Sequence, residues 1–133
     1  MKIRTDYVTN SSSSSFIIAK HKSCTIDELK EMLNKHRKNI HELLDSYDGD
    51  LYCEYRSDIR DAYNSNNFDK AIDLAIDVIA EGLWKDGWNP MQLDNWSVKS
   101  SYGSNEDGEL FGCALYDFGW DMDTEHLKVM SGD

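Results

Sequence analysis

Four carboxylates recur at every fourth position of the segment FDKAIDLAIDVIAEGLW (68–84), and they are Asp69, Asp73, Asp77 and Glu81. In a helix, a step of four residues places neighbouring side chains on adjacent turns of one face, where like charges repel each other weakly. A row selected only for helix stability would include more lysines than Lys70 and Lys85. We therefore expect a negative surface that attracts a basic partner, and a solvated face on an acidic protein is the plainer alternative.

Two further features extend this candidate surface. The preceding segment LYCEYRSDIRDAY (51–63) has helical spacing and carries Glu54, Asp58 and Asp61. Together with the first row, these acids could imitate the charge of a phosphate backbone. Trp88 lies in the loop sequence LWKDGWNP, and we expect it to be an exposed anchor because tryptophan is enriched in interface hot spots.

A second candidate site is the run of five serines near the start of the chain. Hydroxyls and free backbone N–H groups beside cations could hold a phosphate. The residues of this alternative anion site are Ser11, Ser12, Ser13, Ser14, Ser15, Lys2, Arg4 and Lys20. Two other interpretations remain open, namely a mobile loop and a segment that another protein reads or phosphorylates. A phosphate-binding P-loop is excluded, because its glycine and lysine pattern is absent.

Signatures of catalysis and metal binding are missing from the sequence. Cys24, Cys53 and Cys113 lack the flanking motifs of catalytic cysteines, and the chain has no G-x-S-x-G. The acidic runs DSYDGDLYCE (45–54) and YDFGWDMDTEH (116–126) do not match a calcium-binding EF-hand loop. We expect no catalytic residue, no metal and no cofactor, and an enzyme that uses the serine loop is kept as the alternative.

The charge of the chain is unevenly distributed. The net charge is −11; residues 1–44 carry eight Lys/Arg and five acids, whereas residues 45–133 carry six Lys/Arg and twenty acids. An acidic body repels nucleic acid and anionic lipid and attracts basic protein surfaces. We therefore expect a protein partner, with no direct nucleic-acid or membrane binding. The odd number of widely spaced cysteines is typical of reduced thiols in a cytoplasmic protein.

The hydrophobic pattern predicts the elements that position these residues. FIIAK (16–20) has the pattern of a buried strand, and Thr25 with Glu28 forms a capping box for a helix over 26–45. Segment 68–84 is the strongest predicted helix. His36 falls on the apolar stripe of the first helix, as a core or boundary residue.

The last third of the chain changes to a strand-like pattern. We expect two strands in NWSVKSSYG (95–103) and ELFGCALYDFGW (109–120), joined as a hairpin at Asp107-Gly108, and a final strand in EHLKVM (125–130). The predicted fold class is α+β, with a small antiparallel sheet of the N-terminal strand and the C-terminal hairpin packed against two or three helices. One domain covers 1–133, with 1–15 as a candidate mobile segment.

The opening MKIRTDYVTNSSSSSFII (1–18) resembles the lead of a set of small, uncharacterised bacterial and phage proteins. These share K-I-R-T-D-[FY]-V-T-N-S-S-S-S-S-F followed by diverse bodies. The resemblance covers little more than a tenth of the chain and implies a bacterial or phage source, with no activity and no catalytic residue to carry over.

The sequence as a whole favours a non-enzymatic acidic interaction protein. It would present carboxylate-rich helical faces to a basic, nucleic-acid-binding surface of a partner, in the manner of an anti-CRISPR inhibitor.

Overall fold

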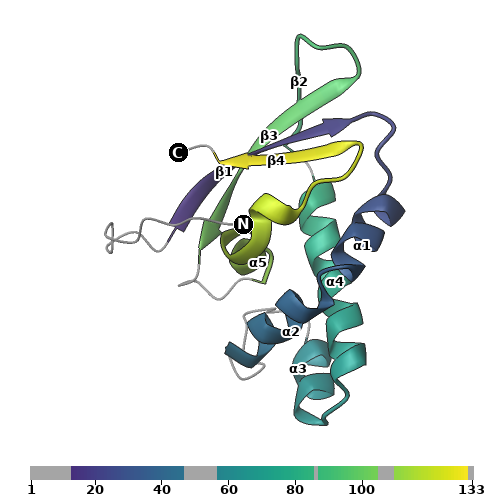
Figure 1. Cartoon of the computed structure of the whole chain (residues 1–133), viewed down its shortest axis with the longest axis vertical. Coiled ribbons are helices and arrows are strands. Elements are labelled where there is room, and N and C mark those ends of the chain that lie inside the picture. The colour runs from purple at the N-terminus through teal and green to yellow at the C-terminus, as the bar shows by residue number, and fades with distance from the viewer. Residues whose placement is uncertain (1–12, 47–56, 86, 105–109, 132–133) are drawn as a thin grey trace.

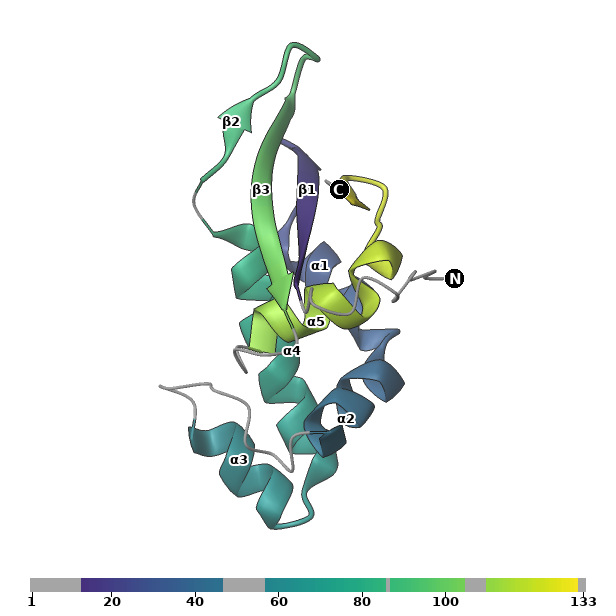
Figure 2. The same ribbon diagram turned by 90° about the vertical axis from the view of Figure 1, so that its left-hand side faces the viewer.

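The computed structural model describes residues 13–46, 57–85, 87–104 and 110–131, and the segment 1–12 and Glu54 lie outside these ranges. The described residues confirm the α+β class: they form five helices and a four-stranded antiparallel sheet in the order β2 (Asn89–Pro90), β3 (Trp96–Ser104), β1 (Ser13–His21), β4 (Leu127–Ser131) (Figure 1). The sheet forms one end of the molecule, and helices α2 (Arg37–Ser46) and α3 (Ser57–Asn64) lie at the other end (Figures 1 and 2). Helix α4 connects the two ends.

The central strand β1 (Ser13–His21) includes the predicted segment 16–20 and extends it at both ends. It pairs with β3 (Trp96–Ser104) over its whole length and with β4 (Leu127–Ser131) over Phe16–Lys20. The short strand β2 (Asn89–Pro90) adds to the far side of β3. Ser13 to Ser15, which we expected in a mobile segment, are therefore strand residues paired with β3.

The single helix predicted over 26–45 is two helices, α1 (Ile26–Asn34) and α2 (Arg37–Ser46). The chain turns at Lys35 and His36, whose N–H groups donate to carbonyls only three residues back. Tertiary contacts explain the break, because His36 Nε2 lies 3.1 Å from the carbonyl of Asp121 and its ring packs against Phe118.

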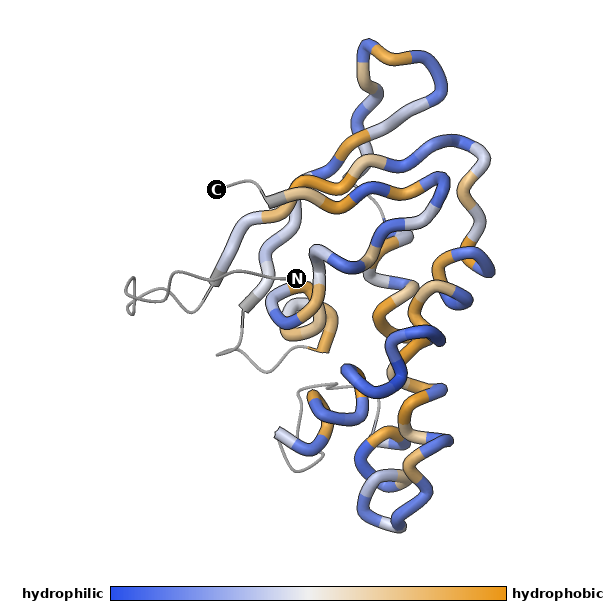
Figure 3. Tube along the Cα trace, viewed as in Figure 1, coloured by the Kyte–Doolittle hydropathy of each residue, from blue (hydrophilic) through white to orange (hydrophobic). Residues whose placement is uncertain are grey.

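Helices α3 (Ser57–Asn64) and α4 (Phe68–Trp84) form an antiparallel pair joined at Asn66, which adopts a positive φ of 63°. The prediction of a long helix in segment 68–84, with its end near Gly82–Trp84, is confirmed. Its apolar stripe is buried along its length and packs on α1, α2 and α3. In Figure 3 its tube alternates between hydrophobic and hydrophilic turns, as expected for a helix with one buried face.

The predicted C-terminal hairpin is wrong, because its second strand is the helix α5 (Leu110–Phe118), followed by the 3₁₀ turn η1 (Gly119–Asp121). A short run that is apolar on nearly all sides fits a buried helix as well as a buried strand. Two glycines let α5 lie under the sheet. A Cβ at Gly103 would lie 2.8 Å from the backbone nitrogen of Tyr116, and one at Gly82 would lie 2.5 Å from the Phe111 ring.

Candidate functional site

The four predicted carboxylates of α4 lie in one row, and three of them are ion-paired with cations from α1 and α2. Arg37 Nη1 donates to Asp73 Oδ1 at 2.6 Å, and its Nη2 lies 3.5 Å from Asp69 Oδ1. Lys30 Nζ lies 3.2 Å from Asp77 Oδ1. The hydrogen bond with Asp73 raises the pKa of Arg37 above its ordinary value, with burial opposing it more weakly. The row is therefore partly neutralised by residues far away in the sequence.

These ion pairs leave the carboxylates open to solvent. The side chains of Asp69, Asp73 and Asp77 are 93%, 66% and 48% exposed, and Glu81 is exposed as well. Exposed pairs of this kind contribute only about 0–1 kcal/mol each. The row together with Lys30 and Arg37, called the ion-pair seam below, is therefore solvated and has more acids than cations.

A shallow groove runs between α1 and α4 beside this seam. It has a volume of about 340 Å³ and is lined by Lys30, Glu31, Asn34, Asp73, Ile76 and Asp77. The lining thus has three carboxylates, one ammonium group and one apolar side chain, and Arg37 pairs with Asp73 from beside the groove. This arrangement is suited to a guanidinium or ammonium group whose aliphatic stem can cover Ile76.

The other predicted contact residues do not join this groove. Asp58 and Asp61 are exposed on α3, and the carboxylate of Asp58 accepts the N–H of Ile59. Glu54 lies outside the described residues. The lining of the groove comes from α1 and α4 and includes no acid of α3.

Trp88 is half-buried and packs on the core, so the expectation of an exposed anchor is wrong. Lys20 Nζ lies 4.1 Å from the ring centroid of Trp84 and 4.6 Å from that of Trp88. The buried Lys99 donates to the carbonyls of Gly82 and Lys85, at 2.9 and 3.2 Å. This cation caps the C-terminus of α4, where the helix dipole favours positive charge.

The anion site is not assembled among the residues that the structure describes. Ser13 to Ser15 occupy the first positions of β1, and Lys20 lies near its far end, about 17–23 Å away at the usual rise of a strand. Its ammonium group is taken up by the two tryptophan rings. Ser11, Ser12, Lys2 and Arg4 lie outside the described ranges.

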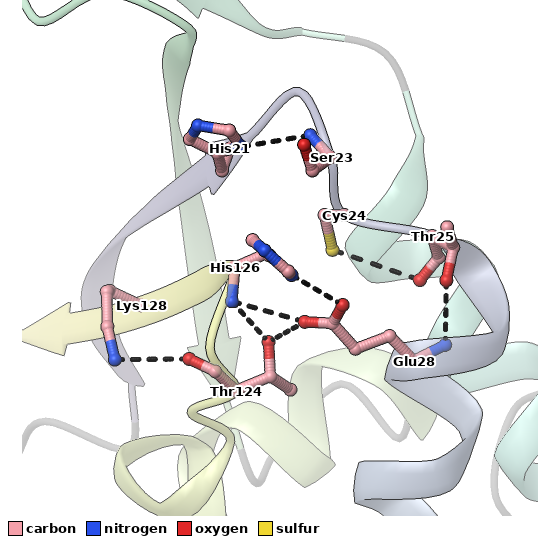
Figure 4. Close-up of polar contacts among 8 residues, drawn as sticks. All are labelled: His21, Ser23, Cys24, Thr25, Glu28, Thr124, His126 and Lys128. Carbon is pink, nitrogen blue, oxygen red and sulfur yellow. Dashed lines mark hydrogen bonds and ion pairs between the residues drawn. The ribbon is translucent and has the colours of Figure 1, made fainter.

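A polar cluster that the sequence did not reveal joins α1 to the turn before β4 (Figure 4). The Glu28 carboxylate accepts hydrogen bonds from the Thr124 hydroxyl and from the His126 backbone N–H, the latter at 3.2 Å. His126 Nδ1 lies 2.8 Å from Glu28 Oε1. The predicted cap is half correct, because Thr25 Oγ1 accepts the Glu28 N–H at 3.1 Å while the carboxylate turns away to Thr124.

The surroundings of Glu28 determine its ionisation. Burial alone would raise its pKa, but the hydrogen bonds from Thr124 and His126, with the charge of His126, outweigh burial and hold the pKa below its ordinary value. A carboxylate that orients a histidine is also part of nucleophilic triads. The cysteine beside it does not fit that role, because burial and the Glu28 charge raise the pKa of Cys24 to about 11. The cluster therefore acts as a clamp between α1 and β4.

The residues of the C-terminal acidic run separate in the fold. Asp123 Oδ1 accepts the N–H of Val129, and Glu125 is exposed. Across the described ranges, no three His, Cys, Asp or Glu side chains come together in a way that could hold a metal ion. None of the helices in those ranges is long and apolar enough to span a membrane.

Compared with protein-family models, curated proteins and solved structures, the chain gives no match.

Proposed function

We propose that this chain is a non-enzymatic acidic interaction protein, and that the groove between α1 and α4 binds a basic side chain on the surface of a partner protein. The observation that carries the proposal is the excess of acid at the groove, where three carboxylates (Glu31, Asp73 and Asp77) and one ammonium group (Lys30) form the lining and Arg37 pairs with Asp73 from beside it. A concave site with an excess of carboxylates attracts a cation from a partner and positions it.

Internal ion pairs do not prevent this binding, because they are exchangeable. The pairs of Lys30 and Arg37 lie at the surface and contribute little, so an arginine of a partner can replace either cation at small cost. Arginine gains more than lysine from such a site, since its planar fork can bind two carboxylate oxygens at once.

The class of partner follows from the charge. A row of carboxylates on successive helical turns competes with phosphates for the basic groove of a nucleic-acid-binding protein. A phage-encoded inhibitor of a host nuclease would use such a surface, and the resemblance of residues 1–18 to bacterial and phage leads supports that source.

The proposal is tested with a fluorescent oligoarginine peptide as the probe, by anisotropy at about 0.05 M and about 0.5 M salt. Wild type should bind at low salt and lose most of its affinity at high salt. The double variant Asp73→Asn, Asp77→Asn should weaken binding about tenfold, because two carboxylates of the groove are lost.

The matched control is Asp94→Asn, Asp121→Asn, which removes the same charge at exposed positions outside the groove. It should change the affinity less than about twofold. Equal losses in the two double variants, or an affinity that does not depend on salt, would refute the groove as the binding site. Affinity capture from the host, with the groove variant as the negative control, then identifies the partner.

A further inference from the structure

Among the residues that the structure describes, helices cover one face of the sheet and no helix lies on the other. Phe16, Ile18, Leu127 and Val129 point to the helices and are buried. The alternate residues of the same strands point the opposite way, and in Figure 1 the helices lie below and to the right of the sheet.

Three exposed apolar side chains meet on this outer face. Ile17 of β1 is directly opposite Met130 of β4, and Tyr102 of β3 is diagonal to Ile17, within reach of an aromatic ring. Their exposed fractions are 37%, 47% and 68%. A contiguous apolar patch on an open sheet face is typical of a protein interface, and tyrosine and methionine are both enriched in interfaces.

The charge of the face indicates which protein can approach it. Among the described strand residues that point outward, none has a carboxylate, and Lys128 is the only Lys or Arg. At one end of the face the His21 ring packs near two other rings. Its centroid lies 5.2 Å from that of Trp96 and 5.5 Å from that of His126. Two copies of a chain with net charge −11 repel each other, and no carboxylate among the described outward strand residues adds to that repulsion at this face.

Part of each sheet edge is closed to pairing with another strand. On the outer side of β4, Asp123 Oδ1 accepts a hydrogen bond from the N–H of Val129, and the N–H of Thr124 donates to the carbonyl of Leu127. The opposite edge strand β2 contains Pro90, which has no N–H to donate. β2 covers only Ser97 and Val98 of β3, so strand pairing is hindered at part of each edge, and the exposed apolar side chains of the outer face favour a face-to-face contact.

We propose that two copies of this chain form a dimer across a two-fold axis, with the outer faces of their sheets packed together and Ile17, Tyr102 and Met130 at the centre. Aligned sheets pack about 10 Å apart with strands crossing at about 30°. Across a two-fold axis each copy contributes the same surface patch, so the assembly is a closed dimer that adds no further copies.

The size of the face predicts a weak dimer. A nine-residue strand is about 30 Å long and three strands are about 14 Å across, so the footprint is about 400 Å² per copy. Standard stable interfaces bury about 800 Å² per partner. We therefore expect a dissociation constant in the micromolar range, and an acidic groove that faces away from the contact in each copy.

Sedimentation velocity of the full chain, from about 1 μM to several hundred μM, tests the proposal. The mass should rise from that of a 15.3 kDa monomer toward twice that value. Tyr102→Glu and Met130→Glu should each weaken the dimer at least about tenfold, because they place a like charge in the centre of the contact. Tyr102→Ser gives a milder second variant if a glutamate disturbs folding.

Leu93→Glu is the matched control, since Leu93 is 64% exposed but lies outside the face, in the turn between β2 and β3. It should leave the dimer unchanged. A chain that stays monomeric at all concentrations, or a dimer that Tyr102→Glu and Tyr102→Ser leave intact, overturns the proposal. A monomer that binds a labelled single-stranded oligonucleotide in a Tyr102-dependent way would assign the face to nucleic acid instead.

Discussion

The acidic residues of the groove and the carboxylate of Glu28 are chemically alike, yet the structure uses them differently. Asp73 has one arginine as its partner and a side chain that is 66% exposed. The Glu28 side chain is 24% exposed. Its carboxylate accepts hydrogen bonds from Thr124 and His126, which precede β4 in the chain. A partner can compete for the first carboxylate, whereas the second is already committed to the fold.

Cations follow the same division. Lys30 and Arg37 reach their acids at the surface of α4, and water competes with both pairs. Lys99 is buried at the opposite end of that helix and its donors are directed to backbone carbonyls. A charged group is thus part of the scaffold where its partners are held away from water, and available for recognition where they are not.

The largest effect should come from the buried cation. Lys99→Met keeps the apolar stem but removes the donor for the carbonyls of Gly82 and Lys85, and we expect the free energy of unfolding to fall by about 2–3 kcal/mol. Urea unfolding followed by circular dichroism measures this. Lys70→Met, on the exposed side of the same helix, is the control and should have almost no effect; equal losses would remove the distinction between the two regions.

Glu28→Gln should have the next largest effect, about 1–2 kcal/mol, because the charged acceptor of the Thr124 and His126 donors is lost. The same substitution at Glu31, an exposed residue of α1, supplies the comparison and should cost much less. A Glu28 variant as stable as the Glu31 variant would show that the clamp does not stabilise the fold.

The Glu28 clamp also predicts a dependence on pH. Its pKa is lower in the folded chain than the ordinary value of 4.5, so its contribution is complete above pH 4.5 and is lost as the pH falls through the folded pKa. The difference in unfolding free energy between wild type and Glu28→Gln should therefore shrink as the pH falls below about 4.5. A difference that stays constant down to pH 3 would contradict the lowered pKa.

Asp73→Asn should have the smallest effect on stability, below about 1 kcal/mol, even though it removes the 2.6 Å contact with Arg37. Thermal unfolding at low and high salt, beside Asp94→Asn, measures it. A loss above about 2 kcal/mol would place Asp73 with Glu28 as a structural residue and would weaken the case for the groove as a binding site.

Local patterns predicted the elements whose apolar period is unambiguous. Helix α4 has seventeen residues with a clear stripe, and the strand around Ile18 is short, apolar and β-branched. The run Leu110–Phe118 is apolar on nearly every side, so period alone could not separate helix from strand, and the glycines that admit the helix lie elsewhere, at positions 82 and 103.

The candidate site shows the same limit. The row Asp69, Asp73, Asp77, Glu81 could be recognised from its spacing, but Lys30 and Arg37 come from helices more than thirty residues earlier. Glu28 had the sequence signature of a cap, and only its partner 96 residues later gave it another role.

By itself, the sequence determined the fold class, the long helix, the central strand and the excess of acid, because these depend on local propensity, on the period of apolar residues and on composition. Tertiary structure decided which carboxylates are paired, where the predicted helix over 26–45 breaks and which face of the sheet has no helix on it. Those features depend on contacts between distant segments, whose energies no local pattern contains.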